Sequence, residues 1–298
     1  VPPLLRWRTR MRYVALPDGR RGLHVHRSDE VVEIEDCLID ASGDPSRRSG
    51  DLPRPSSDLP RPSGDLPRRS SGVETTETVR TSYGTGDLPR PSGGLPRRSG
   101  DLARPSGGVE TTETVRASYG TRDFAVAPDG FWQSHVEAPR VLVETVLGML
   151  RPEPGERVLD LYAGVGLFAA FLADAVGPSG RVVAVEGSRI ACRDARANLP
   201  PSVRVEHGPV DRVLASSYDE PFDLVLLDPP REGARREVVE QVADRAPRAV
   251  AYVACDPAAL ARDLATFGSL GYAVRDFRAF DLFPMTFHAE CVAHLVKR

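Results

Sequence analysis

The stretch AVAYVACDPAALARDL, residues 249–264, decides the architecture of the chain. Six apolar or small residues precede Cys255, a density typical of a central parallel strand with helices on both faces. Asp256 and Pro257 then favour a turn and the first residues of a helix that runs to Leu264. Cys255 is therefore expected at the carboxyl end of a strand, where open α/β sheets bind ligands. A thiol at a helix N-terminus is also biased towards the thiolate, although a small core residue is the alternative.

The composition indicates a globular core in one half of the chain only. Of the 298 residues 41% are hydrophobic, and the 27 Pro and 26 Gly crowd the first half. The four cysteines have irregular spacing, which indicates a reducing compartment without a disulfide framework; they are Cys37, Cys192, Cys255 and Cys291. No apolar run approaches the roughly 20 residues of a membrane helix. We expect a cytoplasmic monomer with no membrane partner.

From residue 122 onwards, strand patterns alternate with helix patterns. Such alternation requires parallel strands joined by crossover helices. The sequence therefore predicts a doubly wound α/β sheet of seven strands over residues 122–298. The predicted strands lie in ERVLDLYAG (156–164), RVVAVEG (181–187), VRVEHG (203–208), FDLVLLDPP (222–230), AVAYVAC (249–255), YAVRDFRAFDL (272–282) and ECVAHLVK (290–297).

The first 121 residues differ from the rest of the chain in composition and sequence pattern. Residues 1–40 contain short β-type runs with few large apolar residues, which predicts a small, incomplete β region. The segment 50–85 recurs as 86–121, and each copy opens with units of the form DLPRPSG. Two prolines in a unit exclude both helix and central strand. We expect residues 41–108 to be a disordered, duplicated insertion and residues 109–121 to be a hairpin that leads into the α/β domain.

Two motifs in the first part of the predicted sheet suit a nucleoside ligand. In VLDLYAGVGLF (158–168) a strand ends in Asp160, and Gly164 and Gly166 let the backbone approach a ligand closely. The next strand ends in Glu186, whose carboxylate can accept hydrogen bonds from both ribose hydroxyls. The pair resembles the glycine-loop and acidic-residue motifs of class I S-adenosylmethionine-dependent methyltransferases. A glycine turn in another α/β fold is the alternative.

Four further motifs carry a more specific resemblance. They are GFWQSH (130–135), LVLLDPPREG (224–233), YVACDPAALARDL (252–264) and FPMTFHAE (283–290). In this order they resemble the motifs of the uracil-5 RNA methyltransferase family, which includes the tRNA and ribosomal RNA m5U enzymes. The N-terminal run from WRTRMRY to EDCLI resembles the RNA-contacting middle region of such enzymes. The resemblance implies S-adenosyl-L-methionine as cofactor and RNA, either tRNA or rRNA, as partner.

The chemistry of uracil explains the residue types in these motifs. C5 of uracil is a poor nucleophile, so a thiolate must first add to C6 and make an enolate. The resemblance implies Cys255 as this nucleophile and Glu290 as the base that removes the C5 proton, with its pKa raised by partial burial. The resemblance also implies six residues that contact the cofactor. They are Gln133, Tyr162, Glu186 and Asp228, together with the loop glycines Gly164 and Gly166.

The chain departs from the family pattern at several positions. His135 stands where the family has Asn, and Ala254 and Asp256 replace the Ser and Asn beside the cysteine. Asp256 would oppose thiolate formation if it faced the sulfur. Some members of the family bind an iron–sulfur cluster through four cysteines, and Cys37 alone could match one of them. We therefore expect no iron–sulfur cluster and no metal.

Two rival hypotheses stay open at this point. One is an amino methyltransferase of the same fold, for which Cys255 would be dispensable. Against it, Arg231 follows the DPP loop, where amino methyltransferases typically carry an aromatic residue. The other is a catalytically inactive relative that binds RNA or the cofactor. The sequence does not choose between tRNA and rRNA.

Overall fold

The structure is a computed structural model that describes Arg8, three short strands between residues 14 and 33, and residues 111–298 except Met285 and Phe287. The short strands pair antiparallel in the order β1-β2-β3; they are β1 (Val14–Ala15), β2 (Arg21–His24) and β3 (Val31–Glu33). The remainder of the predicted region 1–40, with Cys37, lies outside the described residues. So do the predicted insertion 41–108 and residues 109 and 110.

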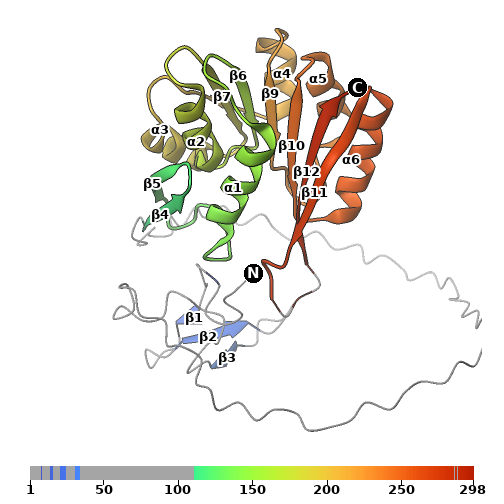
Figure 1. Cartoon of the computed structure of the whole chain (residues 1–298). Coiled ribbons are helices and arrows are strands. Elements are labelled where there is room, and N and C mark those ends of the chain that lie inside the picture. Colours follow the sequence, from blue (N-terminus) through green and yellow to red (C-terminus); the bar gives the residue numbers. More distant parts are fainter. Residues whose placement is uncertain are drawn as a thin grey trace, which may run out of the picture. The chain divides into compact units, whose positions relative to one another are not determined.

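A seven-stranded sheet forms the core of residues 111–298 (Figure 1). Its order is β11-β12-β10-β9-β6-β7-β8, and β12 runs antiparallel between β10 and β11. This arrangement confirms the predicted doubly wound α/β fold. The strands are β6 (Arg157–Leu161), β7 (Arg181–Glu186), β8 (Arg204–His207), β9 (Leu224–Leu227), β10 (Ala249–Ala254), β11 (Tyr272–Phe280) and β12 (Glu290–Lys297).

Helices cover both faces of this sheet, because successive apolar residues of each central strand point to opposite sides. Val158 and Leu224 pack in one buried cluster, whereas the next residues, Leu159 and Val225, pack in the other. The first cluster is covered by α1 (Ala138–Leu150), α2 (Leu167–Val176) and α3 (Arg189–Asn198). The second is covered by α4 (Val210–Ser217), α5 (Arg235–Asp244) and α6 (Pro257–Ser269). None of the helices in the described part of the chain is long and apolar enough to cross a bilayer.

A two-stranded hairpin precedes the sheet and packs against its helices. It consists of β4 (Thr111–Ala117) and β5 (Gly120–Val126), so it extends beyond residue 121, where we placed the domain boundary. The side chain of Asn198 on α3 accepts from the N–H of Ala125 at 2.8 Å and donates to its carbonyl at 3.0 Å. The hairpin is thereby held beside α3, and it delivers the segment that leads into α1.

A buried carboxylate joins the DPPREG loop to the strand and helix around Cys255. Asp263 on α6 is fully buried, and its Oδ2 accepts from the Tyr252 hydroxyl at 2.7 Å and from the Ala234 N–H at 2.8 Å. Arg262 pairs with the other oxygen of Asp263 at 3.0 Å and donates to the carbonyl of Glu232 at 2.7 Å. These bonds fix the loop after β9 against β10 and α6.

Gly233 lets the loop approach this carboxylate. Its φ of +78° lies in the left-handed region, and a Cβ at this position would lie 2.6 Å from both Asp263 Oδ2 and Arg262 Nη2. A side chain therefore fits neither the backbone conformation nor the space. Gly233 of the DPPREG motif and Arg262 and Asp263 of the ALARDL motif are parts of one contact.

Removal of the Asp263 carboxylate should destabilise the protein. Asp263→Ala leaves the Tyr252 hydroxyl and the Ala234 N–H without their buried acceptor, so we expect the free energy of unfolding to fall by about 3 kcal/mol. Urea denaturation of the full chain measures this change. The matched control is Asp219→Ala, at an exposed acid, which should leave the free energy nearly unchanged. Equal unfolding free energies for the two variants would contradict the importance of this contact.

Candidate active site

The carboxyl edge of the sheet gathers the side chains proposed for chemistry. The register pairs Leu161 with Leu227 and Leu227 with Tyr252, so Tyr162 and Asp228 follow at the same edge of β6 and β9. Cys255 directly follows β10 at this edge. Since β12 is antiparallel, its first residue rather than its last lies there.

Cys255 and Glu290 lie at the same end of β10 and β12. The antiparallel register of the two strands ends at the pair of Ala254 with Cys291, and Cys255 and Glu290 are the residues next to this pair. The charge of Glu290 raises the pKa of the Cys255 thiol, so the two groups lie close enough to interact. A thiol from one motif and a carboxyl group from another thus face a common space.

The glycine loop after β6 takes up a conformation that needs its glycines. Tyr162, Gly164 and Gly166 have φ angles of 64°, 56° and 91°. A Cβ on Gly166 would lie 2.8 Å from the side chain of Leu199, whereas a Cβ on Gly164 would meet no atom within 4 Å. Gly166 is therefore required by packing. Gly164 borders open space at the sheet edge.

Glu186 is held by backbone donors at the end of β7. Its Oε2 accepts from the N–H of Gly164 at 2.9 Å, and its Oε1 accepts from the N–H of Ser188 at 2.7 Å. Two fixed donors orient the carboxylate beside the glycine loop. Each oxygen has further lone pairs that can accept ribose hydroxyls.

Asp160, which was not among the predicted site residues, carries an orphaned carboxyl group. It is fully buried near the end of β6, and neither of its oxygens meets a donor in good hydrogen-bond geometry among the described residues, although the N–H of Ala169 lies near enough to lower its pKa somewhat. Burial, followed by the charge of Asp228, raises its pKa to about 8. The group is mostly protonated at pH 7 and can donate a hydrogen bond. Its place directly before the glycine loop was the signal in the sequence.

Asp228 and Glu290 are also acids with raised pKa values. Burial, with a smaller effect of Glu186, raises the pKa of the partly buried Asp228 to about 7. Burial and then the charge of Asp228 raise the pKa of Glu290, which is 5% exposed, to about 8. Burial thus shifts the pKa of Glu290 in the direction expected for a base that works near neutral pH.

The structure does not favour the Cys255 thiolate in the free protein, contrary to our expectation from the helix N-terminus. Burial raises the pKa of the half-buried thiol, and the charges of Glu290 and Asp228 raise it further. The nearby guanidinium of Arg231 lowers it. Desolvation and the two acidic neighbours therefore raise the pKa of Cys255 by more than the N-terminus of α6 lowers it.

Asp256 caps the helix instead of facing the sulfur. Its Oδ1 accepts from the N–H of Ala259 at 2.8 Å, so it is the N-cap residue of α6. Asp256 is not among the groups that shift the pKa of Cys255. The departure from Asn at this position therefore keeps the capping role, since both side chains are good N-caps.

Arg231 is a second residue that the sequence did not single out as part of the site. It follows the DPP loop, is exposed, and its Nη2 lies 3.4 Å from Nε2 of His288. Its charge favours the thiolate of Cys255. The signal in the sequence was its position directly after two prolines that aim the loop at the sheet edge.

The segment before α1 carries Gln133 and His135. Gln133 is partly buried there, and the strand pairings that gather the other residues do not include it. His135 is buried, and its Nδ1 accepts from the N–H of Glu137 at 3.0 Å. The imidazole nitrogen thus accepts from the N–H two residues later, as an Asn oxygen does in an Asx turn.

No group of three or more His, Cys, Asp or Glu residues in the described part of the chain is arranged to hold a metal ion. Cys192, Cys255 and Cys291 are free thiols.

Comparison with known proteins identifies two matching family models and several similar proteins. The family model for tRNA (uracil-5-)-methyltransferase matches residues 210–298, and the model for protein-L-isoaspartate (D-aspartate) O-methyltransferase matches residues 113–215. Two uncharacterized RNA methyltransferases, from Streptomyces coelicolor and Streptomyces avermitilis, are each 42% identical over 97% of this chain. The chain spans 63% and 67% of their lengths.

Two characterised proteins are also similar to parts of the chain. The 23S rRNA (uracil(1939)-C(5))-methyltransferase RlmD of Acinetobacter baylyi is 35% identical over 57% of this chain and 38% of its own length. The crystal structure of Pyrococcus abyssi tRNA (uracil-54, C5)-methyltransferase in complex with S-adenosyl-L-homocysteine is 30% identical, with a TM-score of 0.51. That match covers 62% of this chain and 44% of the Pyrococcus chain. The chain therefore belongs to the uracil-5 RNA methyltransferase family.

Proposed function

We propose that this chain transfers a methyl group from S-adenosyl-L-methionine to C5 of a uridine in RNA, through a covalent bond between Cys255 and C6 of the base. The observation that carries the proposal is the antiparallel register of β10 and β12, which brings Cys255 and Glu290 to the same end of two paired strands. Further support comes from the relatives, one of which acts on 23S rRNA and another on tRNA. Both RNA classes are candidates for the substrate.

The residues at the sheet edge fit the cofactor. Open space borders Gly164, the Glu186 carboxylate is oriented towards the loop, and the buried carboxyl of Asp160 lacks a partner in the described structure. We assign ribose binding to Glu186, and further cofactor contacts to Asp228, Tyr162, Gly166 and Gln133. When bound, S-adenosyl-L-methionine supplies an electrophilic methyl group and a positive charge, which suits an edge with several acids.

Cys255 begins the reaction on the base. Its thiol loses a proton to solvent, which reaches the half-buried sulfur, and Arg231 stabilises the resulting anion. The sulfur adds to C6, and the electrons of the C5–C6 double bond move into an enolate. C5 is then nucleophilic enough to accept the methyl group. In a stacked helix C6 is not accessible, so the uridine must be flipped out of the RNA.

Glu290 completes the reaction. After methylation, C5 carries both the new methyl group and its original proton. The Glu290 carboxylate removes this proton, the C–H electrons restore the C5–C6 double bond, and the S–C6 bond breaks. The thiolate of Cys255 is regenerated and the proton stays on Glu290, from which it returns to solvent.

A 5-fluorouridine-substituted RNA should trap the protein. Fluorine at C5 cannot leave as a proton, so the S–C6 bond persists as a covalent adduct that survives a denaturing gel. We expect the adduct with the wild type in the presence of S-adenosyl-L-methionine and none with Cys255→Ala. Cys291→Ala serves as the matched control, because this thiol packs in the buried cluster on one face of the sheet, and it should keep the adduct. Absence of an adduct in a wild-type protein that binds the cofactor would refute the covalent mechanism.

Glu290→Gln should separate the two halves of the reaction. A glutamine cannot remove the C5 proton, so we expect turnover to fall roughly 10²- to 10⁴-fold, while the adduct with unmodified RNA accumulates. A gel that follows both the adduct and free methylated RNA measures this. Glu240→Gln on α5 is the control and should turn over like the wild type. Loss of turnover without adduct accumulation would assign Glu290 to an earlier step.

Breakdown of the adduct should accelerate with rising pH. Burial and the charge of Asp228 raise the pKa of Glu290 to about 8 in the free site, and removal of the C5 proton should follow the titration of this group. A base with a raised pKa is protonated, and inactive, below this value and becomes active above it. Single-turnover quench experiments between about pH 6 and pH 10 should show a rate that is half-maximal near pH 8 and levels off above about pH 9. A flat profile in the wild type would argue against Glu290 as the base.

A further inference from the structure

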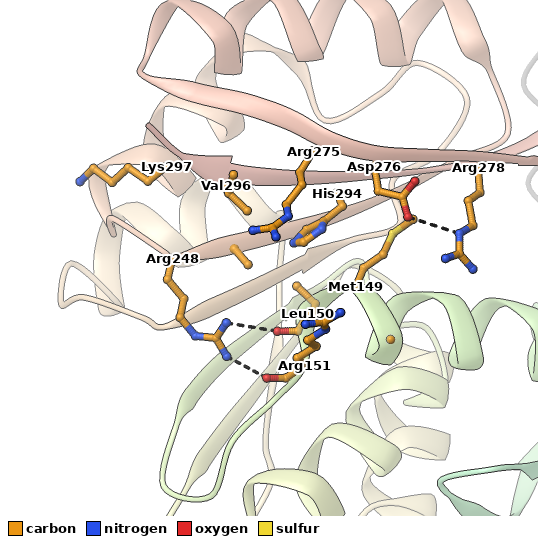
Figure 2. A pocket seen from close by; sticks show the side chains of 12 residues that line it. Met149, Leu150, Arg151, Arg248, Arg275, Asp276, Arg278, His294, Val296 and Lys297 are labelled. Atoms are coloured by element: carbon orange, nitrogen blue, oxygen red, sulfur yellow. Dashed lines mark hydrogen bonds and ion pairs between the residues drawn. The ribbon is translucent and has the colours of Figure 1, made fainter.

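A cavity lies on the α1 face of the sheet, away from the carboxyl edge (Figure 2). It has a volume of about 530 Å³. The C-terminal end of α1 and strands β10, β11 and β12 form its walls. Ala249, the first residue of β10, lines it, so it lies about 20 Å from Cys255 along a strand of six residues. We call this cavity the basic pocket. Its charged and imidazole lining consists chiefly of Arg151, Arg248, Arg275, Arg278, His294 and Lys297.

Positive charge dominates the basic pocket. Five cationic side chains line it, against the single carboxylate of Asp276, which lies 3.4 Å from Nε of Arg278. Arg151, Arg275 and Lys297 have no ion-pair partner among the residues that the structure describes. Like charges around one cavity repel each other, and an anion in the cavity would relieve this repulsion.

Arg248 neutralises the negative end of α1, which would otherwise disfavour an anion. Its guanidinium donates to the carbonyls of Leu150 at 3.3 Å and Arg151 at 2.9 Å, as Figure 2 shows. It also pairs with Glu156 at 2.6 Å. The carbonyls at the helix C-terminus thus already have donors, and the remaining cations are available to a ligand.

His294 supplies a buried ring nitrogen without a partner among the described residues. It is 9% exposed, lies opposite Asp276 on β11, and its Nε2 has no hydrogen-bond partner in the described structure. Burial lowers its pKa, the charges of Arg275, Arg151 and Arg248 lower it further, and Asp276 raises it. The ring is therefore neutral near pH 7. Arg275 and His294 point into the same space in Figure 2.

We propose that the basic pocket binds a phosphate group of an RNA strand, with Arg275, Arg151 and the Nε2–H of His294 as its ligands. Guanidinium groups and an imidazole N–H match the acceptor oxygens of a phosphate. The volume exceeds that of one phosphate and suits a nucleotide of a strand. The assignment of RNA as the source of the phosphate rests on the proposed function. At about 20 Å from Cys255, this nucleotide is not the target uridine, and the contact holds the RNA in position.

The first test observes His294 directly. The full chain is labelled with ¹⁵N-histidine, and the spectrum of His294→Gln identifies the ring signal. The probe is a short oligoadenylate, which contains no uridine and whose phosphodiesters keep their charge over the pH range. We expect oligoadenylate to shift the His294 signal and to raise the pKa of its ring, because the phosphate offsets the charges of the arginines. Oligoadenylate binding should consequently tighten as the pH falls.

Variants test the same contact by affinity. Arg275→Gln should weaken oligoadenylate binding roughly tenfold and reduce the slope of log affinity against log salt by about 0.7, the value for one lost phosphate contact on a single strand. Arg212→Gln is the matched control: it changes an exposed arginine on α4, which covers the other face of the sheet, and should alter neither quantity. Fluorescence anisotropy over a salt series measures both.

The outcomes separate the possible ligands. If inorganic pyrophosphate moves the His294 signal and oligoadenylate does not, the pocket binds free phosphates and the RNA assignment is wrong. If neither probe moves the signal, or if Arg275→Gln and Arg212→Gln bind oligoadenylate equally, the phosphate site itself is refuted. The 5-fluorouridine adduct depends on Cys255 at the other end of the strand. A wild type that forms no adduct but shows the His294 response refutes the proposed chemistry and leaves the pocket standing.

Discussion

The antiparallel pairing of β12 with β10 is the constraint on which the candidate site depends. Six strands run in one direction and bring their carboxyl ends to one edge, and the reversed β12 brings its first residue to the same place. The register then brings Glu290 to the same end of the paired strands as Cys255. A slip of one residue would turn the side chains of β12 to opposite faces and remove Glu290 from this space. Two motifs that are distant along the chain become a single arrangement only through this pairing.

Buried carboxyl groups serve two different purposes in the structure. Asp263 accepts bonds from a hydroxyl, a backbone N–H and a guanidinium, and it holds the DPPREG loop in place. Asp160 has no such partner, and its pKa is raised with those of Asp228 and Glu290. The first carboxylate stabilises the fold. The other three have raised pKa values at the sheet edge, where a cationic cofactor and proton transfer can use them.

Opposite charges occupy the two ends of the strands. Acids gather at the carboxyl edge, and arginines with Lys297 line the basic pocket. The net charge of −3 hides this separation, because a sum over the chain says nothing of position. The basic pocket is a surface that can hold a polyanion at the other end of the strands.

The sequence by itself determined the fold class, because alternating strand and helix periods are local patterns. It also placed Cys255, Glu186 and Asp228 at strand ends, because each of them follows a run of apolar residues. Only the tertiary structure decided that Asp256 caps a helix, that burial raises the pKa of Cys255, and that Asp160 lacks a partner. The basic pocket was likewise visible only in the tertiary structure, because Arg151, Arg275 and His294 come from three different elements. Desolvation and charge–charge effects depend on neighbours that meet through strand register and helix packing, and no local pattern records them.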